Sequence, residues 1–588
     1  MINVTKLSYS FPQKDLYNEV SFSIEQGDHC AFIGTSGTGK STLINILLNP
    51  DDYLYDGKVE IDSACRIGYV KQFSQLEEKS DMTVMDYISE DFKALESKIT
   101  RICEEMASSE DLESLMEDYQ NALDALEAIG GDNYESIIEK NLYLANLTHI
   151  RDLKVTDLSG GEFKLIQIIK NMLGRPELLI MDEPDVFLDF ENLNGLKKLM
   201  NAYKGMLLII THNRYLLNHC FNKIMHLENG DLQTFEGIYV DYNLSLLQSK
   251  IDLQEQSIAD DEEIERNGIL IDKLRFIATH NAEAARGKSL KARVKFQERL
   301  EARRTQAPFV EIKKPKIEFL SPESVSDDED HAVNEPILSV KDYALAFDDV
   351  LLKDVNFDVN PGEKIALIGP NGTGKTTLLR HIYKNMHEEI IVKDSVKMGY
   401  LSQNQGETLC EDNTVTEEFV EAGFDSYREI RMYLRRYGFE LDNLDQKISS
   451  LSGGEKNILQ LAKVGAKPYD LLLLDEPTSH LDTHSQIALE EAIEKFKGAV
   501  VMISHDFYSI VNCMDYVLYI DDKTIRKVSM RKFRKMIYKN HFNKNYLEIE
   551  DRKKEYEIKV AHALQDMDFE LARKWSEKLE TIIKALQE

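Results

Sequence analysis

A glycine-rich loop of the pattern G-x-x-x-x-G-K-[ST] occurs twice in this chain, and no other feature constrains the fold as strongly. The loops are Gly34, Thr35, Ser36, Gly37, Thr38, Gly39, Lys40, Ser41 with Thr42 after it, and Gly369, Pro370, Asn371, Gly372, Thr373, Gly374, Lys375, Thr376 with Thr377 after it. Each follows a short apolar run typical of a buried strand. The glycines let backbone N–H groups surround phosphates, the lysine adds positive charge, and the last hydroxyl reaches Mg²⁺. The following helix adds its positive end.

The same companion residues follow each loop in the same order. After the first loop come Gln72, then Ser159, Gly160 and Gly161, then Asp182 and Glu183, then His212. After the second loop come Gln403, then Ser452, Gly453 and Gly454, then Asp475 and Glu476, then His505. Each Asp-Glu pair ends an apolar run, so we expect a core strand that delivers two carboxylates to one sheet edge. The aspartates are placed to hold Mg²⁺, the glutamates to polarise the attacking water, and the histidines to contact the γ-phosphate.

This order of motifs resembles the ATP-binding cassette (ABC) superfamily, whose most specific mark is the sequence LSGG. The resemblance implies two cassettes that pair head to tail and hold two ATP molecules between them. Site one would join Lys40, Ser41, Gln72, Asp182, Glu183 and His212 to Ser452, Gly453 and Gly454. Site two would join Lys375, Thr376, Gln403, Asp475, Glu476 and His505 to Ser159, Gly160 and Gly161. The expected metal ligands are Ser41, Gln72, Asp182, Thr376, Gln403 and Asp475, and the expected cofactors are ATP and Mg²⁺.

An aromatic residue upstream of each loop often stacks on adenine in this superfamily. Phe11 and Phe347 stand at suitable positions. The alternative is that both are core residues.

Composition agrees with a large ATPase. The 588 residues suggest about four domains, and the repeat indicates two large ones with appendages. No apolar run approaches the ~18 residues that cross a membrane, and the chain begins directly with the first cassette, without a signal peptide. We therefore expect a cytoplasmic protein with no membrane partner. Six scattered cysteines without a C-x-x-C pair argue against zinc and disulfides.

Spacing shows what has been inserted in the first copy. The loop lysines lie 335 positions apart and the glutamines 331, whereas the signatures, glutamates and histidines all lie 293 apart. The first copy therefore carries 38 more residues, the difference between 331 and 293, before its signature. Residues 95–126 are rich in Glu, Leu and Met and predict a helical hairpin. The alternative is a solvated elaboration without a partner.

A second insertion separates the cassettes. Residues 243–280 predict one long helix, acidic at its start, followed by a turn near 281–285 and a strongly basic return helix. Its cations are Arg286, Lys288, Lys291, Arg293, Lys295, Arg299, Arg303 and Arg304. Several share one helical face, which on a chain of formal charge −32 favours binding to a phosphate backbone. The alternative is a solvated helix paired with the acids opposite. The acidic residues 321–335 predict a flexible connector.

These features together resemble the ABC-F proteins. The segment Gly237-Ile238-Tyr239-Val240-Asp241-Tyr242, which leads into the linker, and the basic return helix carry the likeness. It implies an ATPase that binds the ribosome near the E site, with rRNA and tRNA contacts through residues 286–304 and the first-cassette arm at the stalk. The predicted fold is α/β, with two tandem P-loop ABC ATPase domains joined by a long α-helical hairpin linker and followed by a helical C-terminal extension. The boundaries are 1–241 (arm about 90–130), 242–336, 337–530 and 531–588, in a monomer with intramolecular cassette pairing.

Three departures from the family pattern stand out. The first copy has Asp185, Val186 and Phe187 where the second has Thr478, Ser479 and His480. His212 is followed by Asn213 and Arg214, whereas His505 is followed by the commoner Asp506. Since both glutamates are present, we expect hydrolysis at both sites at different rates. The third departure is the C-terminal extension, which is basic and aromatic over 523–544 and amphipathic over 546–588. The basic stretch predicts either RNA binding or the last strand and helix of the second cassette.

The sequence also bears on functions of other classes. A transport ATPase needs no charged hairpin of this length. A chromosome ATPase would need zinc-type cysteines or a far longer coiled coil, although a DNA-associated ABC-F protein stays open. Within the family, the short turn over 279–287 favours a translation factor over an antibiotic-resistance protein that protects the ribosome.

Overall fold

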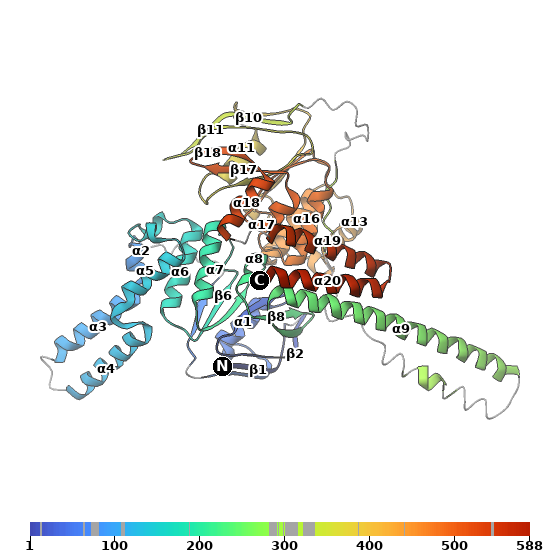
Figure 1. Cartoon of the computed structure of the whole chain (residues 1–588), viewed down its shortest axis with the longest axis horizontal. Coiled ribbons are helices and arrows are strands. Elements are labelled where there is room, and N and C mark those ends of the chain that lie inside the picture. Colours follow the sequence, from blue (N-terminus) through green and yellow to red (C-terminus); the bar gives the residue numbers. More distant parts are fainter. Residues whose placement is uncertain are drawn as a thin grey trace. The chain divides into compact units, whose positions relative to one another are not determined.

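The computed structural model describes residues 1–11, 14–62, 65–71, 81–106, 112–186, 188–280, 291, 293–297, 299, 315–321, 335–347, 349–385, 387–439, 441–541 and 546–587. They form two compact units (Figure 1). The first contains Met1–Glu236 and Lys313–His541, and the second contains Gly237–Ile312 and Phe542–Glu588. Both cassettes therefore lie in the first unit.

The first cassette has two sheets. A six-stranded sheet has the order β5-β6-β7-β3-β8-β9, parallel except for β9, and a three-stranded antiparallel sheet has the order β2-β1-β4. The strands are β1 (Ile2–Phe11), β2 (Lys14–Ile24), β3 (His29–Ile33), β4 (Asp56–Ile61), β5 (Ile67–Val70), β6 (Leu178–Asp182), β7 (Met206–Ile210), β8 (Lys223–Glu228) and β9 (Asp231–Glu236).

Helices surround this sheet and form the arm. They are α1 (Lys40–Leu48), α2 (Val84–Ile88), α3 (Glu90–Met106), α4 (Leu112–Ile129), α5 (Tyr134–Leu144), α6 (Gly160–Leu173), α7 (Phe190–Ala202) and α8 (Arg214–His219). The predicted helical hairpin corresponds to α3 and α4, which lie side by side (Figure 1). Few arm residues are buried, because both helices are polar on most of their surface.

The second cassette repeats the same plan. Its sheets have the orders β14-β15-β16-β12-β17-β18 and β11-β10-β13. The strands are β10 (Leu338–Ala346), β11 (Val350–Val359), β12 (Lys364–Ile368), β13 (Ile390–Val392), β14 (Met398–Leu401), β15 (Leu471–Asp475), β16 (Ala499–Ile503), β17 (Tyr516–Asp521) and β18 (Thr524–Ser529). The helices are α11 (Lys375–Lys384), α12 (Val415–Glu421), α13 (Tyr427–Leu434), α14 (Leu441–Leu444), α15 (Gly453–Gly465), α16 (Thr483–Lys495), α17 (Phe507–Cys513) and α18 (Met530–His541). The predicted twin α/β architecture is confirmed.

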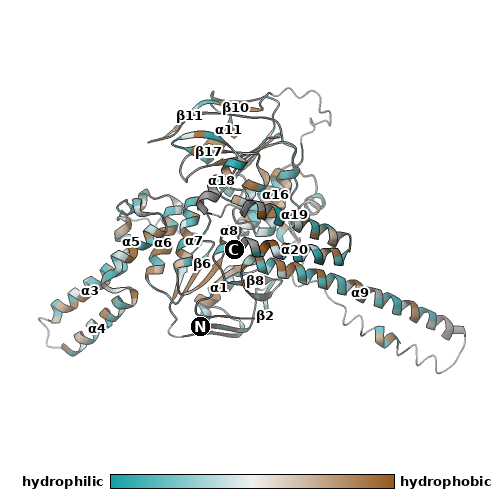
Figure 2. Cartoon of the chain, in the orientation of Figure 1, coloured by the Kyte–Doolittle hydropathy of each residue, from teal (hydrophilic) through white to brown (hydrophobic). Residues whose placement is uncertain are grey.

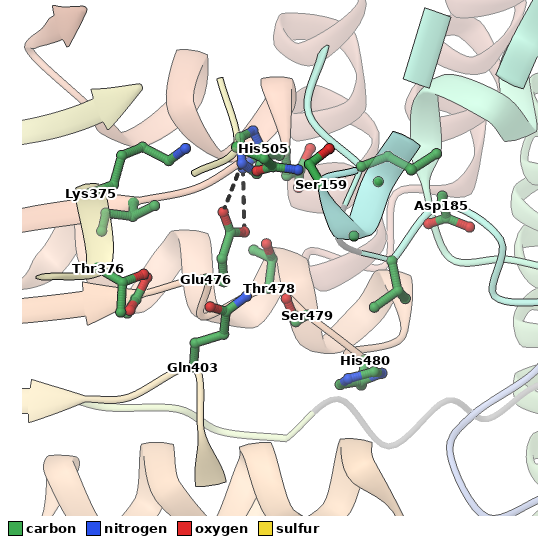
Figure 3. Close-up of a pocket in the computed structure, with 18 of the residues that line it drawn as sticks. Ser159, Asp185, Lys375, Thr376, Gln403, Glu476, Thr478, Ser479, His480 and His505 are labelled. Atoms are coloured by element: carbon green, nitrogen blue, oxygen red, sulfur yellow. Dashed lines mark hydrogen bonds and ion pairs between the residues drawn. The ribbon is translucent and has the colours of Figure 1, made fainter. Parts of the chain in front are cut away.

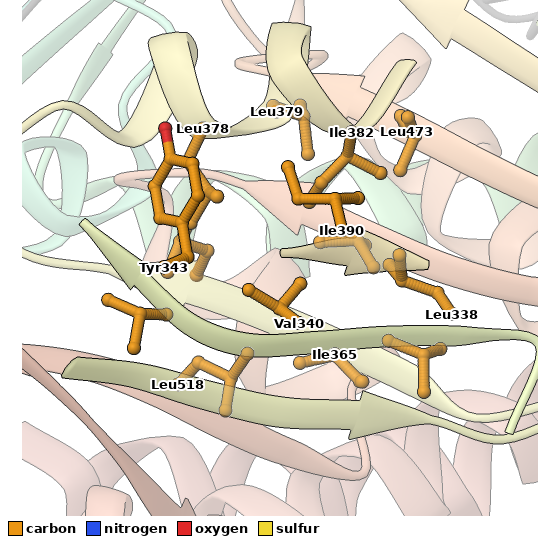
Figure 4. Packing of buried hydrophobic residues seen from close by; sticks show 14 of the residues in the cluster. Leu338, Val340, Tyr343, Ile365, Leu378, Leu379, Ile382, Ile390, Leu473 and Leu518 are labelled. Atoms are coloured by element: carbon orange, nitrogen blue, oxygen red, sulfur yellow. The ribbon is translucent and has the colours of Figure 1, made fainter. Parts of the chain in front are cut away.

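The apolar cores lie between each sheet pair and the helix that follows the glycine-rich loop. In the second cassette, Leu378, Leu379 and Ile382 of α11 face strand residues such as Leu338, Ile365 and Leu473 (Figure 4). Strands β6 and β15 are buried at every position, as expected for inner strands of a parallel sheet covered on both faces. Their apolar sequences suit these inner positions, and the acidic pair that ends each apolar run therefore emerges at the carboxyl end of the strand.

Both signature helices begin with a capping box. The hydroxyl of Ser159 accepts a hydrogen bond from the Glu162 backbone N–H, and the Glu162 carboxylate accepts one from the Ser159 N–H. Ser452 and Glu455 repeat this arrangement at α15. These contacts satisfy N–H groups that a helix start leaves without intrahelical partners. The serine and glutamate of each signature therefore fix where its helix begins.

The second unit consists of the linker and the C-terminal helices. The linker helix α9 (Tyr239–His280) packs with α20 (Phe569–Gln587), and α20 packs with α19 (Tyr546–Gln565), as Figure 1 shows. Ile251 on α9 joins Val560, Ala563 and Ala572 in a small apolar cluster. The Arg573 guanidinium pairs with Asp252 at 3.0 Å and also with Glu255. The amphipathic C-terminal pattern thus corresponds to two helices that pack against the linker helix.

A buried asparagine joins α9 to the return segment of the linker. Asn267 is 3% exposed. Its side-chain nitrogen donates to Gln297 Oε1 at 2.6 Å, and its oxygen accepts from Arg293 Nη1 at 3.1 Å. A buried polar residue in a helical pair has its hydrogen bonds in only one axial alignment, so it specifies register. The turn predicted within 279–287 lies largely outside the described residues.

No helix within the described ranges is long and apolar enough to span a bilayer. The linker helix α9, although 42 residues long, alternates between polar and apolar residues along its length (Figure 2).

The basic stretch that follows the second cassette forms β18 and α18. Strand β18 completes the large sheet beside β17. On α18, Phe533 is fully buried and packs against Phe190 and Phe507, with ring centroids 6.4 and 6.3 Å apart. Of the two alternatives for this stretch, the structure supports the last strand and helix of the cassette. The other two aromatic residues of the stretch after Phe533, Tyr538 and Phe542, lie where side chains are not described.

We expect Phe533→Ala to lower the free energy of unfolding by about 3–5 kcal/mol, because it empties a fully buried aromatic site. Urea denaturation followed by far-ultraviolet circular dichroism measures this change. The matched control is Lys535→Ala on the exposed side of the same helix, expected to change stability by less than about 0.5 kcal/mol. Equal stability of the two variants would contradict the packing described for α18.

Candidate active site

The two glycine-rich loops hold their lysines in the same way. Lys40 Nζ donates to the carbonyls of Gly34 and Thr35 at 2.8 and 2.9 Å. Lys375 Nζ repeats these contacts with Gly369 and Pro370 at 2.8 and 2.7 Å. The residue before each lysine is a glycine with φ of 97° or 87°, a left-handed conformation that other residues rarely adopt. Burial lowers the pKa of both lysines, although nearby carboxylates oppose the shift.

Each loop hydroxyl contacts the aspartate at the end of β6 or β15 in its own cassette. Ser41 Oγ donates to Asp182 Oδ2 at 3.0 Å, and Thr376 Oγ1 donates to Asp475 Oδ1 at 3.3 Å. Burial raises the pKa of both aspartates to about 6. Among the described residues, nothing donates a hydrogen bond to the buried Oδ2 of Asp475. A buried carboxylate oxygen beside a hydroxyl fits the oxygen ligands that Mg²⁺ prefers.

One of the two predicted glutamines lies in the described part of the chain. Gln403 lines a cavity of ≈ 470 Å³ together with Lys375 and Thr376, as Figure 3 shows. Gln72 lies outside the described residues.

That cavity also contains residues of the other cassette. Ser159, Gly160 and Gly161 of the first signature line it opposite the second loop (Figure 3). The Asn371 backbone N–H donates to Asp189 Oδ2 of the first cassette at 3.3 Å. The cavity volume lies within the range of small-molecule sites. Residues of both predicted halves of site two are therefore brought together.

The first loop meets the second signature just as directly. A Cβ atom on Gly454 would lie only 2.5 Å from Ser36 Oγ and 2.8 Å from the His480 carbonyl oxygen, so no side chain fits at this position. Gly453 packs against the imidazole of His480. The cassettes thus pair head to tail, with each loop facing the signature of the other copy.

The two glutamates differ in their surroundings. Glu183 Oε2 lies 2.9 Å from Nδ1 of His480, a residue of the second cassette. Glu476 instead contacts its own cassette, with 3.5 Å between Oε1 and His505 Nε2 (Figure 3). Burial tends to raise the pKa of Glu183, but the hydrogen bond from His480 and the charges nearby lower it overall. For Glu476, burial and repulsion from Asp475 raise the pKa.

Of the histidines that follow β7 and β16, His212 is buried and the side chain of His505 is 13% exposed. Burial lowers the pKa of His212 to about 4 and that of His505 to about 3, and the loop lysines add to the shift. Both rings are therefore neutral at physiological pH and suited to hydrogen bonding rather than to ion pairing.

The aromatic residues proposed for adenine stacking are not core residues. Phe11 is 48% exposed and Phe347 is 70% exposed. Phe11 makes an edge contact with Tyr9. Adenine stacking stays a prediction.

Sequence reasoning missed two groups that hold the site together. Glu228, at the end of β8, accepts hydrogen bonds from the Thr35 N–H at 3.1 Å and from its hydroxyl at 2.9 Å. Arg214 donates across the cassette interface to Asp506 at 2.8 Å and to Glu490, and it stacks over Tyr508. No motif marked Glu228, and Arg214 stood in the departure after His212 without a predicted partner. The capping glutamates Glu162 and Glu455, by contrast, carried a readable S-x-x-E signal.

The unusual Asp185 has a local partner. Its carboxylate accepts a hydrogen bond from Thr211 at 2.6 Å, and burial raises its pKa to about 6. At the equivalent place in the second copy, Thr478 and Ser504 lie 3.4 Å apart. The substitution therefore exchanges a hydroxyl pair for a hydroxyl–carboxyl pair. Phe187, the position equivalent to His480, lies outside the described residues.

Comparison with known proteins agrees with this geometry. A family model described as "ABC transporter" matches residues 17–186 and 352–479. The chain is 32% identical over 527 residues to the ABC transporter ATP-binding protein YfmM of Bacillus subtilis, covering 86% of this chain and 96% of that protein. It is 31% identical over 549 residues to ABC transporter F family member 2 of Arabidopsis thaliana, covering 89% of this chain and 76% of that protein.

The solved structure of a protein called RNase-L Inhibitor has a similar fold. Its TM-score is 0.51, with 18% identity and 92% of each chain covered. An archaeal ribosome recycling factor, aABCE1, gives the same TM-score at 17% identity, covering 91% of this chain and 92% of that one. At these identities the likeness concerns the fold of tandem cassettes.

The fold and the paired loops define an ATPase of the ATP-binding cassette type, which binds and hydrolyses ATP. Within that class, the chain belongs to the ABC-F family, as its relatives show.

The residues present fit a Mg²⁺ ion at each site. Ser41 with Asp182, and Thr376 with Asp475, would hold it, and Gln403 lines the same cavity in the second site. Bound there, Mg²⁺ would neutralise charge on the phosphate oxygens. Glu183 and Glu476 would accept a proton from the attacking water, and the loop lysines would bind phosphate oxygens.

Asp475→Asn should raise the Mg²⁺ concentration needed for half-maximal ATP hydrolysis by at least about tenfold, because a neutral amide replaces a buried anionic ligand. Titration of Mg²⁺ in a steady-state phosphate-release assay measures this. Asp412→Asn, at an exposed acid of the same cassette, is the matched control and should leave the midpoint unchanged. An unaltered midpoint in Asp475→Asn would remove this residue from the metal site.

Glu183→Gln and Glu476→Gln should reduce the ATPase rate by different factors, since one glutamate is held by the opposite cassette and the other by its own. Glutamine keeps the shape but cannot accept the proton, so a loss of about 10²-fold or more at the affected site is expected. Single-turnover hydrolysis separates the two sites. Equal losses would contradict functional asymmetry.

Proposed function

We propose that this ATPase acts on translation by binding the ribosome near the E site. ATP-driven closure of the two cassettes favours the bound form, and hydrolysis releases it. The protein works in the cytoplasm as a monomer with intramolecular cassette pairing. The linker hairpin contacts tRNA and rRNA, and the arm formed by α3 and α4 meets the stalk region.

The linker is the observation that carries this proposal. Helix α9 has 42 residues, a length of about 63 Å at 1.5 Å per residue. On the return segment, Lys291, Arg293, Lys295 and Arg299 are exposed. Exposed cations on a chain of net charge −32 are what a phosphate backbone attracts. The further cations Arg286, Lys288, Arg303 and Arg304 lie outside the described residues.

The cassette interface supports the switch. Residues of both cassettes make up each candidate site, so ATP between them would bind the paired arrangement better than the separated one. A ligand shifts such an equilibrium only through this difference in affinity. Among similarly folded proteins, one is named as a ribosome recycling factor and another is described as ribosome-bound Pelota and ABCE1. Those names favour translation over transport as the process served.

The Glu183→Gln, Glu476→Gln double variant should sediment with ribosomes in ATP and not in ADP, because blocked hydrolysis retains the closed form. Ultracentrifugation through a sucrose cushion with quantification of the pellet measures this. Failure to pellet with either nucleotide would overturn the proposal, and binding to duplex DNA in the same assay would favour a DNA-associated ABC-F protein.

Charge reversal in the linker tests the contact itself. Lys291→Glu, Lys295→Glu and Arg299→Glu together should weaken ribosome binding and reduce its salt dependence by about three units in a log–log plot. The matched control reverses three exposed lysines of the cassettes, Lys198, Lys204 and Lys467. Equal weakening by both sets would contradict a specific linker contact. Protection of translation from peptidyl-transferase antibiotics would assign the resistance role in place of a translation factor.

A further inference from the structure

The candidate catalytic glutamate of site one is contacted by a side chain of the opposite cassette. His480 Nδ1 lies 2.9 Å from Glu183 Oε2, and the two side chains are only 11% and 16% exposed. A carboxylate can only accept, so the ring N–H donates. Hydrogen bonds to an ionised acceptor are among the stronger ones in proteins. The contact therefore restricts where the carboxylate of Glu183 can point.

The second cassette holds His480 in place. Its backbone has φ of 61°, a left-handed conformation that is uncommon for residues other than glycine, although histidine is among those that adopt it more often. Just before it, the Ser479 carbonyl accepts a hydrogen bond from the buried side chain of Asn457 on α15 at 2.6 Å. The ring packs on Gly453, where a Cβ atom would lie 3.3 Å from the His480 Cγ. The imidazole is thus positioned by the signature helix of its own cassette.

The two copies differ here in sequence and in geometry. By the spacing of 293 residues, the first copy has Phe187 at the position of His480, and a phenyl ring has no hydrogen-bond donor. Glu476 instead lies near the histidine of its own cassette, accepting from the His505 backbone N–H at 3.4 Å. One glutamate is therefore oriented from the opposite cassette and the other from within.

We propose that His480 is a positioning residue for ATP hydrolysis at site one. Its hydrogen bond orients Glu183 toward the attacking water, so turnover at site one requires the second cassette to be in contact. Site two has no such requirement for its glutamate. Misplacing a general base by about 1 Å can cost about 10²-fold in rate, so one hydrogen bond is enough to make the two sites unequal. The inference rests on Glu183 acting as the base of site one.

The test measures each site separately. In a Glu476→Gln background, where turnover reports site one, His480→Phe should lower the single-turnover rate by about tenfold or more. In a Glu183→Gln background, which reports site two, the same change should have a much smaller effect. Fluorescent-nucleotide affinity should change by less than about twofold, because an orienting contact affects the chemical step rather than ATP binding. The control is His562→Phe, which makes the same histidine-to-phenylalanine replacement at an exposed position of α19 and should leave both rates unchanged.

Conservative replacement separates positioning from packing. Asparagine places an amide N–H close to where Nδ1 lies, so His480→Asn should recover a substantial part of the site-one rate, whereas His480→Asp, which only accepts, should not. Equal effects of His480→Phe on both sites, or equal losses in His480→Asn and His480→Phe, would overturn the proposal. If Glu183→Gln alone leaves site-one turnover intact, the assignment of the base fails instead.

Discussion

Close approach between the first glycine-rich loop and the second signature is the constraint on which the rest of the cassette pair depends. At Ser36 and Gly454 the two segments come so near that only glycine fits. The capping box then fixes the start of the signature helix. Because neither cassette contains a whole site, the chemistry of one half depends on the placement of the other.

A buried ionic network supports this pairing. Arg214 of the first cassette bonds Asp506 and Glu490 of the second, and Ser509 and Asn512 donate to the same Glu490 carboxylate. A buried ion pair stabilises little by itself, but removal of one partner leaves an uncompensated charge. The network therefore adds specificity for one mutual arrangement. Arg214 lies two residues after His212, and Asp506 directly follows His505. The network therefore connects the pairing of the cassettes to the histidines of both sites.

The twin α/β fold, the loops and the carboxylate-bearing strands were readable in the sequence because local patterns determine them. Gly39 needs a left-handed backbone, and β6 places four consecutive apolar residues before Asp182. The contacts of Glu228, Arg214 and His480 were not readable, because each joins residues 193 to 297 positions apart. The role of the basic C-terminal stretch was ambiguous for the same reason. Only packing shows that Phe533 lies between aromatic residues of both cassettes.

The buried Asn267 fixes how far the linker hairpin extends, because it fixes the alignment of the two linker helices. Its bonds to Gln297 and Arg293 exist in one alignment of the two helices. A slip by one heptad would move the tip by about 10 Å along the helix and leave the amide buried without those partners. The distance that the hairpin extends from Asn267 to its turn thus depends on the number of residues between them, and not on the total length of the insertion. In a relative with a longer linker, the hairpin would extend farther only where the added residues lie between the buried asparagine and the turn.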